Sequence, residues 1–210
     1  GVLAHTNPDD EAIESLRSLR TSLYFSLRQA HNNLIMLTGA SPKVGKSFTS
    51  VNLAAVLADA SKKVVVVDAD LRRGTVHRYF GKHRQHGLAE VLTQDLDILK
   101  FARRTDVDGL YVITSGVLPP NPSELLLHES FETKMAILAE NFDYVVIDAP
   151  PILAVTDAAI IGQHVATTLM VIKDNFHPMR ELEQATQQLH HAGIKISGAV
   201  FNSVTIKTGR

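Results

Sequence analysis

Short apolar runs alternate with longer segments of helical period along the chain. Most of the runs are apolar almost throughout, which is typical of strands that are covered on both faces of a sheet. Between them, apolar residues recur every three or four positions, the spacing of one face of a helix. We expect strands at 34–38, 64–68, 110–114, 144–148, 168–172 and 196–201, and helices at about 9–29, 46–60, 122–140 and 178–192.

This alternation predicts a doubly wound α/β fold, in which helices flank a mainly parallel sheet. No internal repeat or long linker divides the chain, so we expect a single domain over residues 1–210. In such folds, ligands bind beyond the carboxyl ends of the strands. The loops that follow the strands are therefore where we expect the chemistry.

Composition narrows the classes of function that the chain can have. Its formal net charge is −1, whereas general nucleic-acid binders carry a basic excess, so we expect no nucleic-acid partner. The absence of cysteine excludes disulfides, thiolate metal sites and iron–sulfur ligation. No segment approaches the ~18 apolar residues of a membrane span. The chain begins at Gly1 rather than Met, and we expect it to be a fragment of a longer protein.

The segment ASPKVGKS, residues 40–47, follows the first predicted strand and opens a predicted helix. A phosphate loop has a glycine, any four residues and then Gly-Lys-Ser or Gly-Lys-Thr. Gly45, Lys46 and Ser47 supply the second half, but the first glycine stands one position early, at Gly39, with Ala40 in its place. The strand–loop–helix setting is the one that phosphate binding requires, so we favour a phosphate loop over a plain glycine turn.

The chemistry of such a loop assigns roles to its residues. Successive backbone N–H groups surround the phosphates, helped by the positive end of the helix. Lys46 would reach the β- and γ-phosphates, and the Ser47 hydroxyl would bind Mg²⁺, so we expect ATP and Mg²⁺ as ligands. The expected nucleotide contacts are Ala40, Ser41, Pro42, Lys43, Val44, Gly45, Lys46, Ser47 and Phe48.

Three aspartates follow two other predicted strands: Asp68 and Asp70 in VVVVDAD, and Asp148 in YVVID. A carboxylate at the end of a buried strand is costly unless a cation compensates it, and Mg²⁺ favours one or two carboxylates. Asp148 reads as a Walker-B residue, and Asp68 and Asp70 would complete the metal shell and orient the nucleophile. The expected metal ligands are Ser47, Asp68 and Asp148. A turn or helix cap explains any one of the aspartates, but it explains poorly why all three follow strands of one sheet.

Three further segments have a structural explanation beside a functional one. The stretch NPSE, residues 121–124, predicts a helix start, with Asn at the N-cap and Pro at the first helical position. Thr156 and Asp157 fit contact with a phosphate and an ordinary helix N-cap equally well. Arg72 and Arg73 could hold the nucleotide or an acidic partner, although exposed arginines are common.

Four stretches in this order, TGASPKVGKS, VVVVDADLRRG, PPNPSELL and YVVIDAPP, resemble the catalytic domain of bacterial tyrosine kinases (BY-kinases). The likeness is greatest to the Wzc-type kinases of capsule and exopolysaccharide export, and it covers essentially the whole chain. It implies a P-loop NTPase fold with a deviant Walker A loop. It also implies transfer of the γ-phosphoryl group of MgATP to a tyrosine hydroxyl, which would regulate exopolysaccharide or capsule synthesis and export.

The resemblance implies that Lys46, Asp68, Asp70 and Asp148 are the catalytic residues. A phenol has an unperturbed pKa of about 10, so its attack benefits from a carboxylate that accepts the proton. Asp68 is the expected base, and Asp70 is the alternative. Asn202 leaves the last predicted strand where related ATPases contact the adenine.

The family also has a Glu-x-x-Arg-x-x-Arg helix, matched by Glu14, Arg17 and Arg20, which implies ring-like self-assembly through the predicted helix 9–29. By spacing alone, an ordinary Glu–Arg pair on a solvated face explains this motif. The resemblance further implies a membrane-embedded polysaccharide co-polymerase region, in the same or a partner chain, and a cognate tyrosine phosphatase. It places the domain at the cytoplasmic face of the bacterial inner membrane.

The chain departs from the family pattern in its tyrosines. The family usually carries its acceptor tyrosines in a C-terminal cluster that a neighbouring subunit phosphorylates, whereas this chain ends TIKTGR. Its tyrosines are Tyr24, Tyr79, Tyr111 and Tyr144. Tyr111 and Tyr144 fall in predicted core strands and Tyr79 in a predicted short helix. We therefore expect the acceptor to lie outside this chain.

Two other functions compete with the kinase. Partition and division-site ATPases of the ParA/MinD kind resemble the chain in its aspartate-bearing elements. Their loop has a signature lysine at its second position, where this chain has Ser41, and Lys43 is out of register. The third hypothesis is a non-catalytic module that binds ATP to order an assembly, although nothing obvious is missing from the catalytic set.

Overall fold

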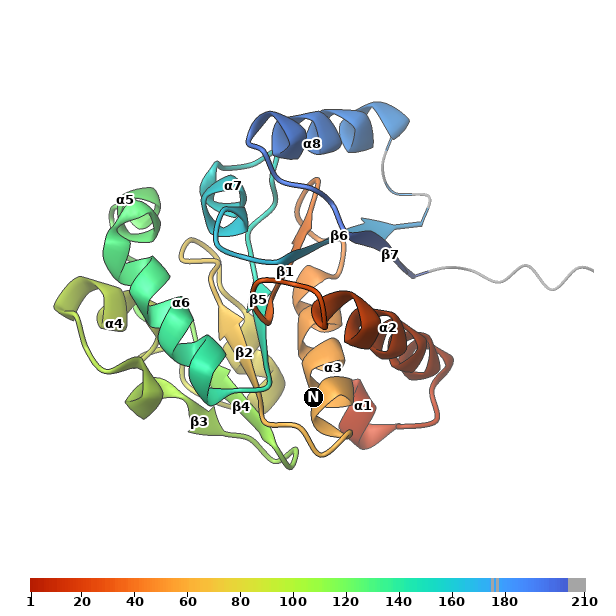
Figure 1. Ribbon diagram of the computed structural model, residues 1–210, viewed down its shortest axis with the longest axis horizontal. Helices are drawn as coiled ribbons and strands as arrows, with labels where there is room; N and C mark the ends of the chain where they lie inside the picture. The colour runs from red at the N-terminus through yellow and green to blue at the C-terminus, as the bar shows by residue number, and fades with distance from the viewer. Residues whose placement is uncertain (175, 177, 204–210) are drawn as a thin grey trace, which may run out of the picture.

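The computed structural model describes residues 1–174, 176 and 178–203, which form a twisted sheet with helices on both faces (Figure 1). Within these residues the sheet has seven strands in the order β3-β4-β2-β5-β1-β6-β7. Neighbouring strands are parallel except β3 and β4. The strands are β1 (Leu34–Gly39), β2 (Val64–Asp68), β3 (Arg103–Arg104), β4 (Leu110–Ile113), β5 (Tyr144–Asp148), β6 (Thr167–Lys173) and β7 (Gly198–Asn202). The predicted doubly wound, mainly parallel fold is confirmed.

Two hydrophobic cores lie on opposite faces of the sheet, because successive residues of a strand point to opposite sides. In β1, Leu34 and Met36 enter one core, and Ile35 and Leu37 enter the other. The first core is covered by α4 (Leu88–Gln94), α5 (Pro122–Leu127), α6 (Glu129–Asn141), α7 (Asp157–Gly162) and α8 (Met179–His191). The second is covered by α1 (Leu3–Thr6), α2 (Glu11–Leu27) and α3 (Lys46–Ala58).

The single helix expected over 122–140 is two helices, which corrects the sequence-based prediction. The backbone of His128 is extended, with φ −66° and ψ 141°, and it separates α5 from α6. The Nδ1 atom of His128 accepts the backbone N–H of Ser130 at 3.2 Å and so caps the start of α6. A local cap of this kind leaves no mark on the apolar pattern, which runs on through both helices.

The other differences concern short elements and the sheet edge. Prediction from the sequence gave no bounds for α1, α4, α7, β3 or the 3₁₀ helices η1 (Val76–Phe80) and η2 (Ile98–Phe101). The last strand begins at Gly198 instead of 196, and its residues alternate in exposure because it lies at the edge of the sheet. In the described part of the chain, no helix combines the length and apolar character needed to cross a membrane.

Candidate active site

Three strands end at the same edge of the sheet, because β1 lies beside β5 and β5 lies beside β2. Asp68 ends β2 and Asp148 ends β5, and the two are direct partners in the parallel register. The phosphate loop, residues 40–47, joins β1 to α3 at this edge. The sheet therefore brings the predicted Lys46, Asp68 and Asp148 together, as expected for strand ends of an α/β fold.

The phosphate loop contains two residues with left-handed backbone, Lys43 at φ 67° and Gly45 at φ 92°. Glycine adopts this conformation without strain. A side chain at position 45 would also collide with the Nδ2 atom of Asn202. That amide donates a hydrogen bond of 2.9 Å to the carbonyl oxygen of Val44. Asn202 thus holds the loop from the end of β7, and its predicted adenine contact stays a prediction.

The displaced glycine of the loop has a packing role. A Cβ atom at Gly39 would lie 2.7 Å from Cγ2 of Val44 and 3.1 Å from the carbonyl oxygen of Val171. Ala40 and Val44 are fully buried, so these two predicted contacts offer a nucleotide only backbone atoms. Gly39 therefore lets the loop close over the end of β1, while residues 45–47 line the cleft beside it.

Asp148 is almost fully buried, and both of its carboxylate oxygens accept hydrogen bonds from α3. The Ser47 hydroxyl lies 2.6 Å from Oδ2, and the Ser50 hydroxyl lies 3.0 Å from Oδ1. Burial raises the pKa of Asp148, against the opposing effects of the Lys46 ammonium and the two serine bonds. Prediction from the sequence missed Ser50, because a small residue on the buried face of a helix gives no signal.

Asp68 is fully buried beside Asp148. Its oxygens accept the backbone N–H groups of Val76 at 3.1 Å and of Asp70 at 3.3 Å. Burial raises the pKa of Asp68 well above its usual range, and the charge of Asp148 raises it further. Two adjacent buried carboxylates favour a bound cation, and carboxylate and hydroxyl oxygens suit Mg²⁺. The residues present therefore fit the expected metal.

Asp70 differs from Asp68 because it is partly exposed and lines the cleft. Its Oδ1 atom accepts the backbone N–H groups of Arg72 at 3.2 Å and of Arg73 at 2.8 Å. The segment after β2 therefore presents one carboxylate inside the protein and another to the cleft.

A cleft of about 650 Å³ opens at these strand ends, a volume within the range of small-molecule sites. The predicted contacts Pro42, Lys43, Gly45, Lys46, Ser47 and Phe48 line it. Its other walls are Asp70, Arg72, Arg73, Thr75, Tyr79, Pro150, Pro151, Ala154 and Val155. Prediction from the sequence missed Ala154 and Val155, because ordinary apolar residues in a loop do not indicate a binding site.

A second hollow of about 650 Å³ lies between α2 and β7 and shares Phe48 with the cleft. Leu16, Leu19, Phe201 and Asn202 are among the residues that line it. The acidic Asp10 and Glu11 and the hydroxyl groups of Ser15 and Thr49 also line it. Phe48 and Asn202 line the same hollow, and their contacts with a nucleotide stay predictions.

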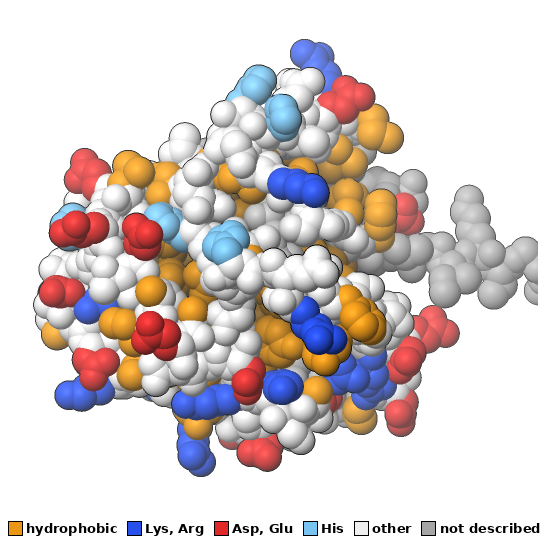
Figure 2. Space-filling model, viewed as in Figure 1, with side chains coloured by type: hydrophobic (Ala, Val, Ile, Leu, Met, Phe, Trp, Pro, Cys, Tyr) orange, Lys and Arg blue, Asp and Glu red, His pale blue; other side chains and the backbone are white. Residues whose placement is uncertain are grey.

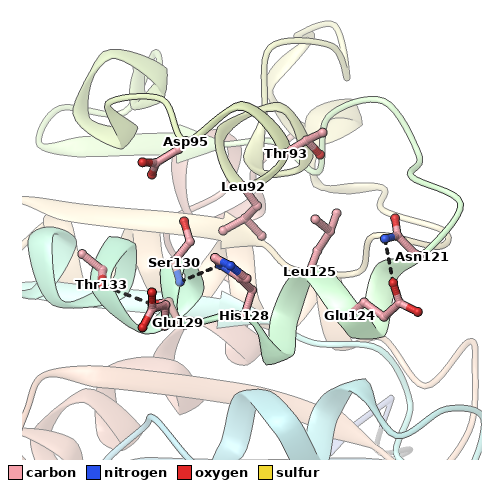
Figure 3. Close-up of a pocket in the computed structure, with 10 residues that line it drawn as sticks. All are labelled: Leu92, Thr93, Asp95, Asn121, Glu124, Leu125, His128, Glu129, Ser130 and Thr133. Atoms are coloured by element: carbon pink, nitrogen blue, oxygen red, sulfur yellow. Dashed lines mark hydrogen bonds between the residues drawn. The ribbon is translucent and has the colours of Figure 1, made fainter.

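A third hollow, of about 600 Å³, lies among α4, α5 and α6 (Figure 3). Its walls include Asp95, Glu124, His128 and Glu129. His128 caps α6, and Asn121 donates a hydrogen bond of 3.0 Å to Glu124, so these groups serve the starts of the two helices. Neither the phosphate loop nor the strand-end aspartates line this hollow, and we assign no chemistry to it.

The predicted assembly motif lies on α2, where charged side chains of both signs gather on the surface (Figure 2). Glu14 and Arg17 form an ion pair with 3.0 Å between Oε2 and Nη1. Arg20 instead donates to the carbonyl oxygen of Val56 in α3, at 2.8 Å. The motif thus makes contacts within its own chain, and its role in assembly stays a prediction.

Known proteins are similar to this sequence over nearly its full length. Residues 33–193 match a family model described as an AAA domain. The tyrosine-protein kinase ptk of Acinetobacter johnsonii is 46% identical over 203 residues, which are 97% of this chain and 28% of that protein. The tyrosine-protein kinase wzc of Salmonella typhimurium is 44% identical over 97% of this chain and 28% of its own length. The chain therefore spans little more than a quarter of the length of these relatives.

Two solved structures resemble this chain to different degrees. The septum site-determining protein MinD from Pyrococcus horikoshii is 19% identical, with a TM-score of 0.68 over 80% of this chain and 69% of its own, and this likeness shows the fold alone. The kinase domain of the Escherichia coli tyrosine kinase ETK is 41% identical, with a TM-score of 0.95 over 100% of this chain and 82% of its own. The chain thus belongs to the family of bacterial tyrosine kinase (BY-kinase) domains.

Proposed function

We propose that this chain is the catalytic domain of a protein-tyrosine kinase, which transfers the γ-phosphoryl group of MgATP to a tyrosine hydroxyl. The observation that carries the proposal is the contact between Ser47 of the phosphate loop and the buried Asp148, with the buried Asp68 beside it. The relatives that are 41–46% identical are named tyrosine kinases. The same set of residues would serve ATP hydrolysis, so the test must identify the acceptor.

The residues of the site bind MgATP together in this proposal. The backbone N–H groups of the loop and the Lys46 ammonium hold the phosphates. Ser47 and Asp148 would hold the metal ion, with Asp68 in the same ligand set. Bound Mg²⁺ would neutralise the charge that develops on the transferring phosphoryl group. The residues of the chain thus act mainly by positioning and by electrostatic stabilisation.

The base that accepts the tyrosine proton is Asp68 in this proposal, with Asp70 as the alternative. The raised pKa of Asp68 brings its proton affinity closer to what a general base needs near neutral pH. Asp70 has the advantage of lining the cleft, where a hydroxyl group can reach it. Replacing each aspartate in turn separates the two assignments.

We infer that the acceptor tyrosine comes from outside this chain. Tyr111 and Tyr144 lie within β4 and β5, and Tyr79 is a half-buried wall of the cleft in η1. Tyr24 is exposed on α2 but does not line the cleft. The likeness to proteins named Wzc and ETK suggests a role in regulating exopolysaccharide or capsule export, at the inner membrane and next to a membrane-embedded partner region. A cognate phosphatase would then reverse the modification.

The test is incubation of the chain with labelled MgATP, with and without a tyrosine-rich peptide. Phosphotyrosine that disappears in Lys46→Met supports the kinase, because this substitution removes the ammonium group and keeps an unbranched side chain that is one atom shorter. The matched control is Lys100→Met, which changes an exposed lysine at the end of η2 and should leave activity unchanged. Free phosphate without phosphotyrosine would indicate a ParA/MinD-type ATPase. Neither product would indicate an assembly module, and both of these results contradict the kinase.

A further inference from the structure

Asp157, the first residue of α7, is fully buried although it carries a carboxylate. Three hydrogen bonds from two side chains compensate its charge. Arg72 donates from Nε to Oδ2 at 2.9 Å and from Nη2 to Oδ1 at 3.2 Å. Ser123 donates its hydroxyl to Oδ1 at 2.7 Å. A buried carboxylate is tolerated when it is paired and hydrogen-bonded in this way.

Arg72 belongs to the segment that carries the two candidate bases. It lies four residues after Asp68 and two after Asp70, and it lines the cleft. Its backbone N–H donates to Asp70 Oδ1, while its guanidinium is fixed on Asp157. The same residue is therefore held at its backbone by a cleft carboxylate and at its side chain by a buried one. Moving the guanidinium would move the turn that places Asp70.

Ser123 closes the network from a third segment of the chain. Its Oγ atom accepts a hydrogen bond of 2.9 Å from Arg72 Nη2 and donates to Asp157. It lies in α5, which packs against α7. The stretch PPNPSELL, which contains Ser123, has no task in phosphate or metal binding, and this contact gives it one. Three segments that are far apart in sequence thus meet at one guanidinium group.

The shape of the guanidinium group makes this arrangement specific. A planar fork donates two bonds to one carboxylate and a third in a fixed direction, which a lysine ammonium does not reproduce. The neighbouring Arg73 has its backbone N–H on Asp70 as well, but none of the described side-chain hydrogen bonds joins it to α5 or α7. Of these two arginines, Arg72 is therefore the one that connects the segment after β2 to α5 and α7.

We propose that Arg72, Asp157 and Ser123 form a positioning clamp that sets the segment after β2, and with it Asp68 and Asp70, relative to the phosphate loop. These are positioning residues, because they act through the aspartates and not on the transferring group. The proposal rests on the proposed kinase function for its kinetic effect. Its structural part, the ordering of residues 68–76, does not depend on any activity.

The kinetic test uses Arg72→Lys and Asp157→Asn in the whole chain, with tyrosine phosphorylation of the peptide as the readout. We expect kcat to fall about 10- to 100-fold with the KM for MgATP within about threefold, because small misplacements of catalytic groups affect the chemical step most. Ser123→Ala should give a smaller loss, and Ser123→Thr, which keeps the hydroxyl, should restore kcat. Asp95→Asn is the matched control, since it breaks the Asp95–Lys134 ion pair outside the cleft and should leave kcat unchanged.

The structural test is amide hydrogen exchange at Arg72, Arg73 and Val76, whose N–H groups donate to the two aspartates. Exchange there should be at least about tenfold faster in Arg72→Lys and Asp157→Asn, and unchanged in Asp95→Asn. Unchanged exchange, or a kcat within twofold of the parent chain, would overturn the clamp. If the parent chain makes no phosphotyrosine, the kinase proposal fails and the exchange data alone decide on the clamp.

Discussion

Asp157 and the pair of Asp68 and Asp148 are buried carboxylates that the protein stabilises in different ways. Asp157 has a guanidinium partner and a hydroxyl donor within the chain. Asp68 and Asp148 lie side by side, and burial raises the pKa of each. Buried charge with a complete partner serves the architecture, whereas buried charge with a raised pKa indicates a functional site where a cation or a proton is to bind. The two regions should therefore respond in opposite ways to the loss of a carboxylate.

The largest expected effect is the loss of the general base. Asp68→Asn should lower kcat about 10²- to 10⁴-fold if Asp68 accepts the tyrosine proton, and Asp70→Asn should then lower it less. Because a base must be ionised, kcat/KM should rise with pH through the raised pKa of Asp68. This rise should be absent in Asp68→Asn. Measuring kcat/KM against pH for the parent chain and both variants checks this.

If Asp70→Asn lowers kcat more than Asp68→Asn does, Asp70 is the base. Binding of MgADP to each variant is the control. Asp68→Asn should weaken it, because Asp68 belongs to the proposed metal ligand set, whereas Asp70→Asn should leave it unchanged, so kcat is compared at saturating MgATP. If both variants keep more than half of the parental kcat, neither aspartate is the base and the assignment of the segment after β2 is wrong.

Much of this site could be predicted because its residues are close in sequence to strand ends. Lys46, Asp68 and Asp148 each follow a strongly apolar run, and parallel strands present such residues at one edge. Arg72 and Asp157 are 85 residues apart, and their pairing depends on where α5 and α7 sit, which no local pattern contains. The short elements were missed for the same reason, since tertiary packing decides them. The break at His128 was missed because a single local cap leaves no mark on the apolar pattern.

A smaller effect concerns the free energy of unfolding. Loss of the carboxylate should change it in opposite directions at Asp157 and at Asp68. Asp157→Asn should lower it by about 1–3 kcal/mol, because the amide leaves the half-exposed Arg72 without its carboxylate. Asp68→Asn should raise it by about 1–2 kcal/mol at pH 7, because it removes a desolvated charge next to Asp148. Urea unfolding of the parent chain and both variants measures these differences.

The pH dependence gives an independent check on that sign. The folded state binds a proton at Asp68 more tightly than the unfolded state does, since burial raises its pKa. The unfolding free energy contributed by this group is therefore highest at low pH and falls as pH rises from the ordinary aspartate pKa of about 3.9 through the raised one. Asp68→Asn should flatten this fall. Equal slopes in the parent chain and the variant would contradict the account of the strand-end pair.

The smallest expected effect separates an exposed ion pair from both buried regions. Glu14→Ala or Arg17→Ala should change the unfolding free energy by only about 0.2–0.5 kcal/mol, because the side chain of Glu14 is 71% exposed and solvent screens the pair. If α2 mediates assembly, the same variants should shift the chain to smaller species in sizing experiments at high protein concentration. Asp95→Ala, which breaks the ion pair between the exposed Asp95 and the buried Lys134, should leave the size unchanged. An elution position unaffected by Glu14→Ala and Arg17→Ala would leave the motif as a simple surface pair.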